Sequence, residues 1–150
     1  MEISIRRASK TEAEQLSGIA LAAKKNWNYP EPWFKLWGDM LKITPEFILN
    51  NNVWVADHNN QIVGFAAISI NESVAELEHM WIIPKHMRKG VGENLIKKVI
   101  EYCQFNGIEK LRIESDPNAQ IFYEKMGAKL IGYVESKPKP RKLPVLELEI

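Results

Sequence analysis

The chain has 150 residues, 45% of them hydrophobic, and its 20 basic and 19 acidic side chains leave a formal net charge of +1. This length and composition can bury a core without metals or disulfides, so we expect one domain over residues 1–150 and no metal site. The near-neutral charge argues against nucleic acid or a membrane as partner. A lone cysteine, a charged N-terminal stretch and the lack of a membrane-spanning apolar run indicate a soluble, cytoplasmic protein.

Hydrophobic periodicity predicts strands and helices along the whole chain. In order, we expect a strand at 3–5, a helix capped by Thr11 and Glu14, a short helix from Pro32, a helical turn within 43–51, strands at 53–56, 61–70 and 74–83, a helix after Gly90, a strand at 111–115, a helix between Asp116 and Gly127, and strands at 129–136 and 143–150. A right-handed crossover lets the strand at 111–115 lie parallel to the one at 74–83. The pattern predicts an α/β (α+β) domain with a mixed, mostly antiparallel sheet and helices on both faces.

A glycine turn joins the strand at 74–83 to the following helix. Gly90 and Gly92 let backbone amides approach a ligand, and the free amides and dipole of a helix start attract phosphate. Lys85, Arg88 and Lys89 add positive charge to the same turn. The turn is therefore a candidate pyrophosphate site; the alternative is an ordinary turn flanked by solvated lysines.

Two common phosphate motifs do not fit this turn. A Walker loop needs Lys and then Ser or Thr after its last glycine, and this chain has Glu93 and Asn94 there. A Rossmann fingerprint needs a third small residue at the position where this chain has Leu95. Residues 87–92, MRKGVG, instead resemble the Gln/Arg-x-x-Gly-x-Gly/Ala motif of the GNAT superfamily of acetyl-CoA-dependent N-acetyltransferases. Met87 replaces the usual polar residue, which removes one side-chain contact.

A second segment, DPNAQIFYEKMG at 116–127, is similar to the Asn-x-x-Ala-x-x-Phe-Tyr-x-x-x-Gly block of the same family. Asp116 stands where the family has asparagine, so the contact of that asparagine with pantetheine is in doubt, and Asn118 either replaces it or does not. The two segments are about the family's distance apart, and the expected order of elements fits from Ile3 to the last strand.

The resemblance implies a sheet of about six to seven strands in which the fourth and fifth splay apart, with the pantetheine arm of acetyl-CoA in the V between them. It implies transfer of an acetyl group to an amine by direct attack in a ternary complex. The residues implied to bind the cofactor are Met80, Trp81, Ile82, Met87, Arg88, Lys89, Gly90, Val91, Gly92, Glu93, Asn118 and Phe122.

Acetyl transfer needs a base, because an amine with a pKa of about 10.4 is neutral in only about one molecule in a few thousand at pH 7. Glu76 and Glu78 are expected to share one strand face with Met80, and the resemblance puts a base or a water relay at about these positions. Glu78 is the first candidate and Glu76 the second; alternatively, both are solvated glutamates. His79 is expected on the opposite face, in a packing role.

Transfer also favours an acid that protonates the departing thiolate, and a phenol with a pKa of about 10 suits a thiol with a pKa of about 8.5. Tyr123 occupies the family's position for this acid. The alternative is an ordinary helix tyrosine packed beside Phe122. The acid role predicts that activity falls at high pH as the phenol ionises.

Aromatic residues concentrate in the stretch at 26–42, where the family has its acceptor pocket. Trp27, Tyr29 and Trp33 are the candidate substrate-binding residues, although Trp33 also belongs to a helical stripe with Trp37 that is typical of a core. The charged loop KPKPRK at 137–142 is expected to be a solvated hairpin end or, alternatively, a contact for acceptor or phosphate.

Four functions remain in competition. The first is an N-acetyltransferase for a small-molecule amine, which the tryptophans favour. The others are a protein or peptide acetyltransferase, a coenzyme A-binding sensor without turnover, and a nucleic-acid module, which would need a basic surplus that this chain lacks. A homodimer formed by pairing of the apolar last strand is a further expectation.

Overall fold

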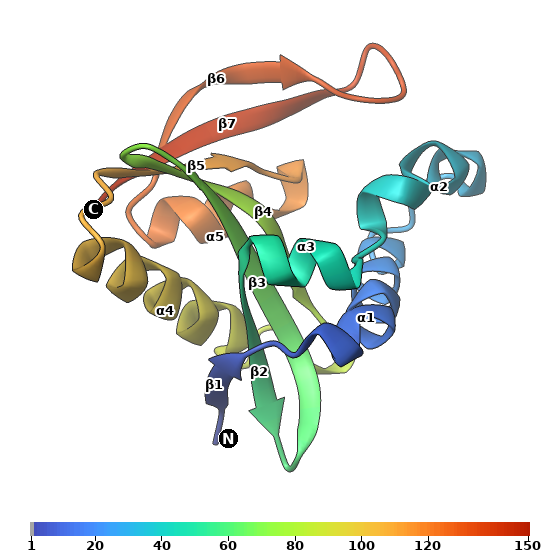
Figure 1. Cartoon of the computed structure of the whole chain (residues 1–150). Helices are drawn as coiled ribbons and strands as arrows, with labels where there is room; N and C mark the ends of the chain where they lie inside the picture. The colour runs from blue at the N-terminus through green and yellow to red at the C-terminus, as the bar shows by residue number, and fades with distance from the viewer. Residues whose placement is uncertain (1) are drawn as a thin grey trace.

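The computed structural model describes residues 2–150, and within them the chain forms a seven-stranded sheet with helices on both faces (Figure 1). The elements are β1 (Ser4–Arg7), α1 (Ala13–Lys25), α2 (Glu31–Trp37), α3 (Pro45–Asn50), β2 (Asn52–His58), β3 (Gln61–Asn71), β4 (Val74–Ile82), α4 (Val91–Phe105), β5 (Lys110–Glu114), α5 (Gln120–Lys125), β6 (Lys129–Glu135) and β7 (Lys142–Glu149). The predicted fold class is confirmed. No helix in this range is long and apolar enough to cross a membrane.

The strand order is β1-β2-β3-β4-β5-β7-β6, and β4 with β5 is the one parallel pair within residues 2–150. This pair begins at Val74 and Lys110 and ends at Leu77 and Ile113, although β4 continues to Ile82. The end of β4 therefore leaves β5, and the expected splayed pair is present.

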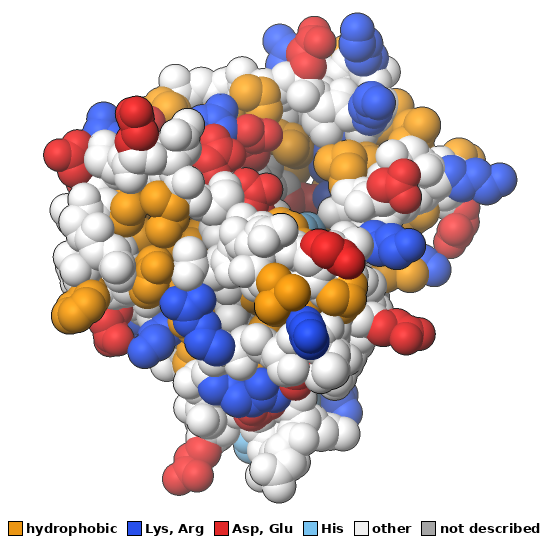
Figure 2. Space-filling view, viewed as in Figure 1, with side chains coloured by type: hydrophobic (Ala, Val, Ile, Leu, Met, Phe, Trp, Pro, Cys, Tyr) orange, Lys and Arg blue, Asp and Glu red, His pale blue; other side chains and the backbone are white. Residues whose placement is uncertain are grey.

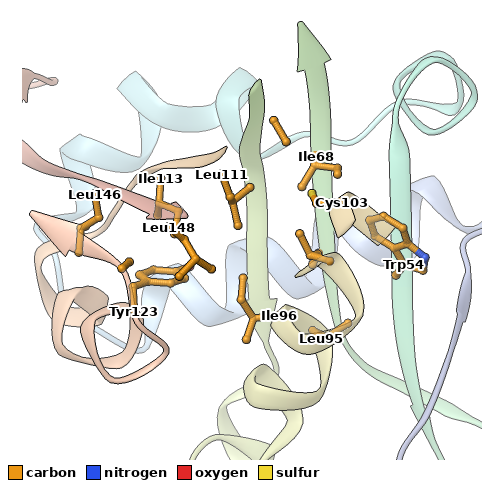
Figure 3. Close-up of a cluster of buried hydrophobic side chains, with 14 of the residues drawn as sticks. Trp54, Ile68, Leu95, Ile96, Cys103, Leu111, Ile113, Tyr123, Leu146 and Leu148 are labelled. Carbon is orange, nitrogen blue, oxygen red and sulfur yellow. The ribbon is translucent and has the colours of Figure 1, made fainter. Parts of the chain in front are cut away.

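Two hydrophobic cores lie on the two faces of the sheet. The core under α4 and α5 contains Leu95, Ile96 and Tyr123 from the helices, packed against residues such as Trp54 and Leu111 (Figure 3). The core under α1, α2 and α3 contains Leu16, Trp37, Val55 and Phe65, among others. The buried stripe predicted for the helix after Gly90 is confirmed, at Val91, Leu95, Ile96, Val99 and Cys103.

The capping box predicted from Thr11 and Glu14 is wrong. The chain uses Ser9 and Glu12, which have the same spacing two residues earlier. The Glu12 carboxylate accepts a hydrogen bond from the Ser9 N–H at 2.7 Å, and it also accepts two bonds from the Arg6 guanidinium on β1. The tertiary contact with Arg6 thus favours the earlier box, which opens a short 3-10 turn ahead of α1.

The last strand is not free to pair with another subunit. β7 is hydrogen-bonded to β5 on one edge and to β6 on the other, so pairing of a second copy with this strand, as expected from its apolar sequence, is excluded. The last strand of the chain is thus an inner strand, and the free edge on this side of the sheet belongs to β6.

Candidate active site

The glycine turn presents unpaired backbone amides, as a diphosphate site requires. The first hydrogen bond of α4 runs from the Asn94 N–H to the Gly90 carbonyl at 3.1 Å, so the amides of Val91, Gly92 and Glu93 have no acceptor inside the helix. Gly90 has φ +85°, a conformation that glycine adopts without strain. A Cβ at Gly92 would lie only 3.3 Å from the Phe122 ring, so a side chain here would crowd the site.

A cavity of about 660 Å³ extends from this turn into the V between β4 and β5 and on to α1 and α2. In the space-filling view the surface is hollowed between the strands and these helices, with acidic side chains on the strand side (Figure 2). The predicted site residues that line the cavity are Trp27, Glu78, Met80, Trp81, Ile82, Met87, Arg88, Gly90, Gly92, Glu93, Asn118, Phe122 and Tyr123. One cavity therefore brings together the candidate base, the candidate acid and the turn.

Five predicted site residues do not line the cavity: Glu76, Tyr29, Trp33, Lys89 and Val91. The Val91 side chain is buried in the core, so this residue can offer only its amide, and Lys89 is exposed. Trp33 stacks on Tyr29, with ring centroids 5.6 Å apart, and both pack against the core under α1 and α2. Trp37, which shares the helical stripe, lines the cavity and is also a core residue.

Tyr123 projects from α5 and is only 6% exposed, but it still lines the cavity. Burial, reinforced by the nearby Asp116 carboxylate, raises the pKa of its phenol far above the usual value of about 10. The phenol therefore keeps its proton throughout the range in which proteins are assayed. Burial therefore argues against the expected loss of activity at high pH through ionisation of this phenol.

A β-bulge separates the two candidate bases. On β3, Ala67 pairs with His79 and Ile68 pairs with Leu77, so Glu78 is an extra residue without a direct partner. The alternation of faces is broken at this point: Met80 and Leu77 both pack against the α4 core, and Glu76 therefore does not share a face with Met80 as expected. The Glu78 carboxylate accepts a hydrogen bond from the Ser69 hydroxyl at 2.8 Å, whereas Glu76 pairs with Arg112 at 3.1 Å.

His79 has the packing role that its position suggested. Its ring lies against Phe47 and Phe65, and its Nδ1 accepts a hydrogen bond from the Trp81 indole at 2.9 Å. Burial lowers the pKa of this histidine to about 4, so the ring is neutral at physiological pH.

A group of charged side chains also lines the cavity, here called the ionic cluster: Lys24, Asp116 and Arg141. The Lys24 ammonium lies 2.7 Å from the Asp116 carboxylate, and the Arg141 guanidinium 3.6 Å from it. The Tyr29 hydroxyl donates to Asp116 at 3.0 Å. Burial alone would raise the pKa of Asp116, but hydrogen bonds from Lys24, the Asn118 backbone and Tyr29 lower it below its usual value.

Lys24 and Asp116 of this cluster did not stand out in the sequence as binding residues. Lys24 follows Ala20 by four positions on the buried stripe of α1, and a lysine on such a stripe is the signal that could have found it. Asp116 caps the turn before α5, as expected from the sequence, by accepting from the Asn118 N–H at 2.9 Å. The Asn118 side-chain nitrogen donates to Asp116 and to the Tyr29 hydroxyl, so it is engaged within the protein.

Within residues 2–150, no group of three or more His, Cys, Asp or Glu side chains is arranged to hold a metal ion.

Comparison with known proteins gives relatives of one kind. Residues 18–128 match the model of the acetyltransferase (GNAT) family. Human N-acetyltransferase 8 is 25% identical over 122 residues, which are 73% of this chain and 53% of that protein, and mouse N-acetyltransferase family 8 member 3 is 23% identical over 124 residues, or 74% and 55%. The chain thus spans about half the length of these relatives.

Solved structures agree on the fold. PaiA N-acetyltransferase from Thermoplasma acidophilum, solved in complex with coenzyme A, superposes with a TM-score of 0.82 at 20% identity, covering 100% of both chains. The ribosomal-protein-S18-alanine N-acetyltransferase from Escherichia coli gives a TM-score of 0.75 at 17% identity, covering 99% of this chain and 94% of that one. With the family model matched over residues 18–128, the chain belongs to the GNAT family of acetyltransferases.

Proposed function

We propose that this protein transfers the acetyl group of acetyl-CoA to the amine of a small molecule, by direct attack in a complex that holds both. The observation that carries the proposal is that one cavity contains four features: the glycine turn before α4, the V between β4 and β5, Glu78 and Tyr123. Membership of the GNAT family supports the same reaction.

The glycine turn before α4 fits the diphosphate of the cofactor. The amides of Val91, Gly92 and Glu93 would donate to its oxygens, with Arg88 as a flexible positive neighbour. The backbone of β4 beyond Leu77, which does not pair with β5, would hold the pantetheine arm in the V. Bound acetyl-CoA supplies a thioester whose carbonyl carbon is open to attack by an amine.

Glu78 acts as the base in this proposal. Its carboxylate lies at the cavity wall, exposed enough to take a proton from an incoming ammonium and pass it to water, and Ser69 fixes its orientation. Glu76 is the weaker candidate, because its carboxylate is occupied by Arg112 and does not reach the cavity.

Tyr123 acts as the acid. Its raised pKa keeps the phenol protonated, so an O–H is present to donate to the sulfur when the thiolate leaves, although the same shift makes the phenol a weaker acid. A small amine fits better than a protein amine, because much of the acceptor end is a pocket walled by apolar side chains such as Trp27, Trp37 and Leu41. A coenzyme A sensor without turnover would not need Glu78 and Tyr123 in the same cavity.

The first test of the proposal is cofactor binding measured by thermal unfolding. Acetyl-CoA should raise the melting temperature, since a ligand that binds only the folded state stabilises it, whereas NAD and ATP should raise it much less. Gly92→Asp should lose the acetyl-CoA shift, because a carboxylate would repel the phosphates and crowd Phe122. Gly132→Asp on β6, where a side chain meets nothing within 4 Å, is the matched control and should keep the shift. Equal shifts from all three nucleotides would contradict the proposal.

We further propose that a homodimer, if formed at the sheet edge, uses β6. Leu130, Ile131 and Tyr133 on this strand are exposed. Antiparallel pairing of two copies centred on Gly132 would place Lys129 opposite Glu135 at both ends. Light scattering of the wild type and of Ile131→Lys measures the mass; a monomeric wild type contradicts this assembly.

A further inference from the structure

The ionic cluster joins three parts of the chain that are far apart in sequence. Lys24 ends the buried stripe of α1, Asp116 follows β5, and Arg141 precedes β7. All three line the cavity that holds Tyr123. Their side chains are only 9–11% exposed. The cluster is thus a buried, ordered part of the cavity wall.

The cluster has more positive than negative charge. Lys24 and Arg141 are two cations, whereas Asp116 is the one carboxylate that pairs with either of them in residues 2–150. Tyr29 does not supply a second anion, because burial raises the pKa of its phenol. Burial, together with the charge of Arg141, lowers the pKa of Lys24, as expected where positive charge is in excess. Such an excess in a buried place is unfavourable unless an anion joins it.

Hydrogen-bond donors of the cluster remain available. The Arg141 guanidinium donates to the Tyr29 hydroxyl at 3.3 Å and to the Ser136 hydroxyl at 3.2 Å, which uses two of its five N–H groups. The Lys24 ammonium donates one bond, to Asp116. Tyr29 and Trp37 lie beside both cations and hold them in place, with the Lys24 nitrogen 4.4 Å from the Trp37 ring centre.

The cavity lining also carries carboxylates outside the cluster. Glu78 and Glu114 line the cavity, and Arg112 pairs with Glu114 and Glu76, so these three carboxylates together exceed the one guanidinium in charge. A molecule that bears an ammonium and an anion would match both groups of charges. The net charge of +1 on the cluster matches a monoanion, and the planar guanidinium of Arg141 suits a carboxylate.

We propose that the acceptor amine also carries a carboxylate, as an amino acid does, and that Lys24 and Arg141 bind this carboxylate while the amine faces Glu78. The inference rests on the acetyltransferase function proposed above. It narrows the substrate class from small amines to small amino acids and related amino carboxylates.

The test compares matched pairs of acceptors that differ only in the carboxylate, such as phenylalanine with phenylethylamine and leucine with 3-methylbutylamine. Thioester consumption gives kcat/KM for each member. We expect the amino acid of the preferred pair to exceed its amine by about 10- to 10²-fold, the scale of hydrogen bonds to charged groups. Equal values within every pair, or higher values for the amines, would overturn the inference while leaving the acetyltransferase function intact.

Variants of Arg141 test the assignment of the residue. Arg141→Met should reduce the preference for the amino acid to within a few-fold of unity, and Arg141→Lys, which keeps the charge, should restore part of it. Lys142→Met, an exposed neighbour outside the cavity, is the control and should keep the wild-type preference. If Arg141→Met keeps the full preference for the amino acid, Arg141 does not bind the carboxylate. If that variant does not fold, the comparison of wild type with Arg141→Lys on the same acceptor pairs tests the role of Arg141.

Binding distinguishes the two proposals. In the presence of coenzyme A, the preferred amino acid should raise the melting temperature more than its amine does. If acetyl-CoA gives no shift and no acceptor consumes thioester, the function itself fails. If acetyl-CoA binds and amines without a carboxylate react best, only the inference on the acceptor fails.

Discussion

The two ends of the cavity are built by different means. At the proposed cofactor end, one continuous segment around Gly90 offers backbone amides, and these do not depend on which side chains they carry. At the proposed acceptor end, side chains would do the binding, and Lys24 and Asp116 come together across 92 positions of sequence. We therefore expect the cofactor end to tolerate departures such as Met87, and we expect a single substitution at the acceptor end to change both specificity and stability.

Tyr123 lines the same cavity, and its variant should have the largest effect. Tyr123→Phe removes one oxygen and keeps the ring in the core, so stability should change little. Turnover should fall by about 10²- to 10⁴-fold, the usual scale for a lost general acid, while the acetyl-CoA shift persists. Because burial raises the pKa of the phenol, wild-type turnover should show no loss up to pH 10 from its ionisation. Normal turnover of the variant would make Tyr123 a packing residue.

Lys24→Met tests whether the acceptor end also stabilises the fold. The change removes the 2.7 Å hydrogen bond from Lys24 and leaves the Asp116 carboxylate with Arg141 as its one cation among residues 2–150, so the free energy of unfolding should fall by about 1.5–3 kcal/mol at pH 7, the scale of a hydrogen bond to a charged group. The control is Lys97→Met, which breaks an exposed pair with Glu93 and should cost less than about 0.5 kcal/mol.

The pH dependence of this loss has a definite sign. Asp116 has a lowered pKa in the folded state, so its stabilising effect is complete above the unfolded value of about 3.9 and is lost as the pH falls through the folded value. The difference between wild type and Lys24→Met should therefore shrink below about pH 4 in denaturant titrations. A difference that grows on acidification would contradict the ion pair.

The two glutamates on β4 should give the smallest and most selective effect. Glu78→Gln keeps the hydrogen bond from Ser69 and removes the base, so the rate should fall by roughly 10²-fold at pH 6 and recover partly as the pH rises and free amine becomes abundant. Glu76→Gln, which faces Arg112, should keep the wild-type pH profile. If Glu76→Gln shows the selective loss instead, the assignment of the base is wrong; if neither does, a water relay supplies the free amine.

Most of the fold could be predicted because periodic patterns are local. The stripe on α4 and the continuous apolar runs of β2 and β3 fix these elements without reference to the rest of the chain. The capping box could not be assigned, because Ser9 with Glu12 and Thr11 with Glu14 satisfy the same rule, and only Arg6 on a neighbouring strand distinguishes them. The position of β7 between β5 and β6 could not be predicted either, because strand order depends on tertiary packing.

The site likewise has one part that the sequence predicts and one part that it does not. Met87, Arg88, Gly90 and Gly92 of the glycine turn line one cavity because they belong to one contiguous motif. The expectation that Glu76 and Met80 share a face is wrong, because nothing in a run of alternating residues marks where a bulge will be inserted. The ionic cluster depends on packing of α1 against the ends of β5 and β7, which no pattern within a single segment encodes.

The bulge at Glu78 has a consequence for how this chain can evolve. Ala67 with His79 and Ile68 with Leu77 would be consecutive rungs of a regular ladder if position 78 were absent. The proposed base therefore stands on a residue that the sheet does not need. Deletion of that one codon would erase the carboxylate and leave both cores with the same side chains, so reactivity at this place can be gained or lost by a length change rather than by a substitution.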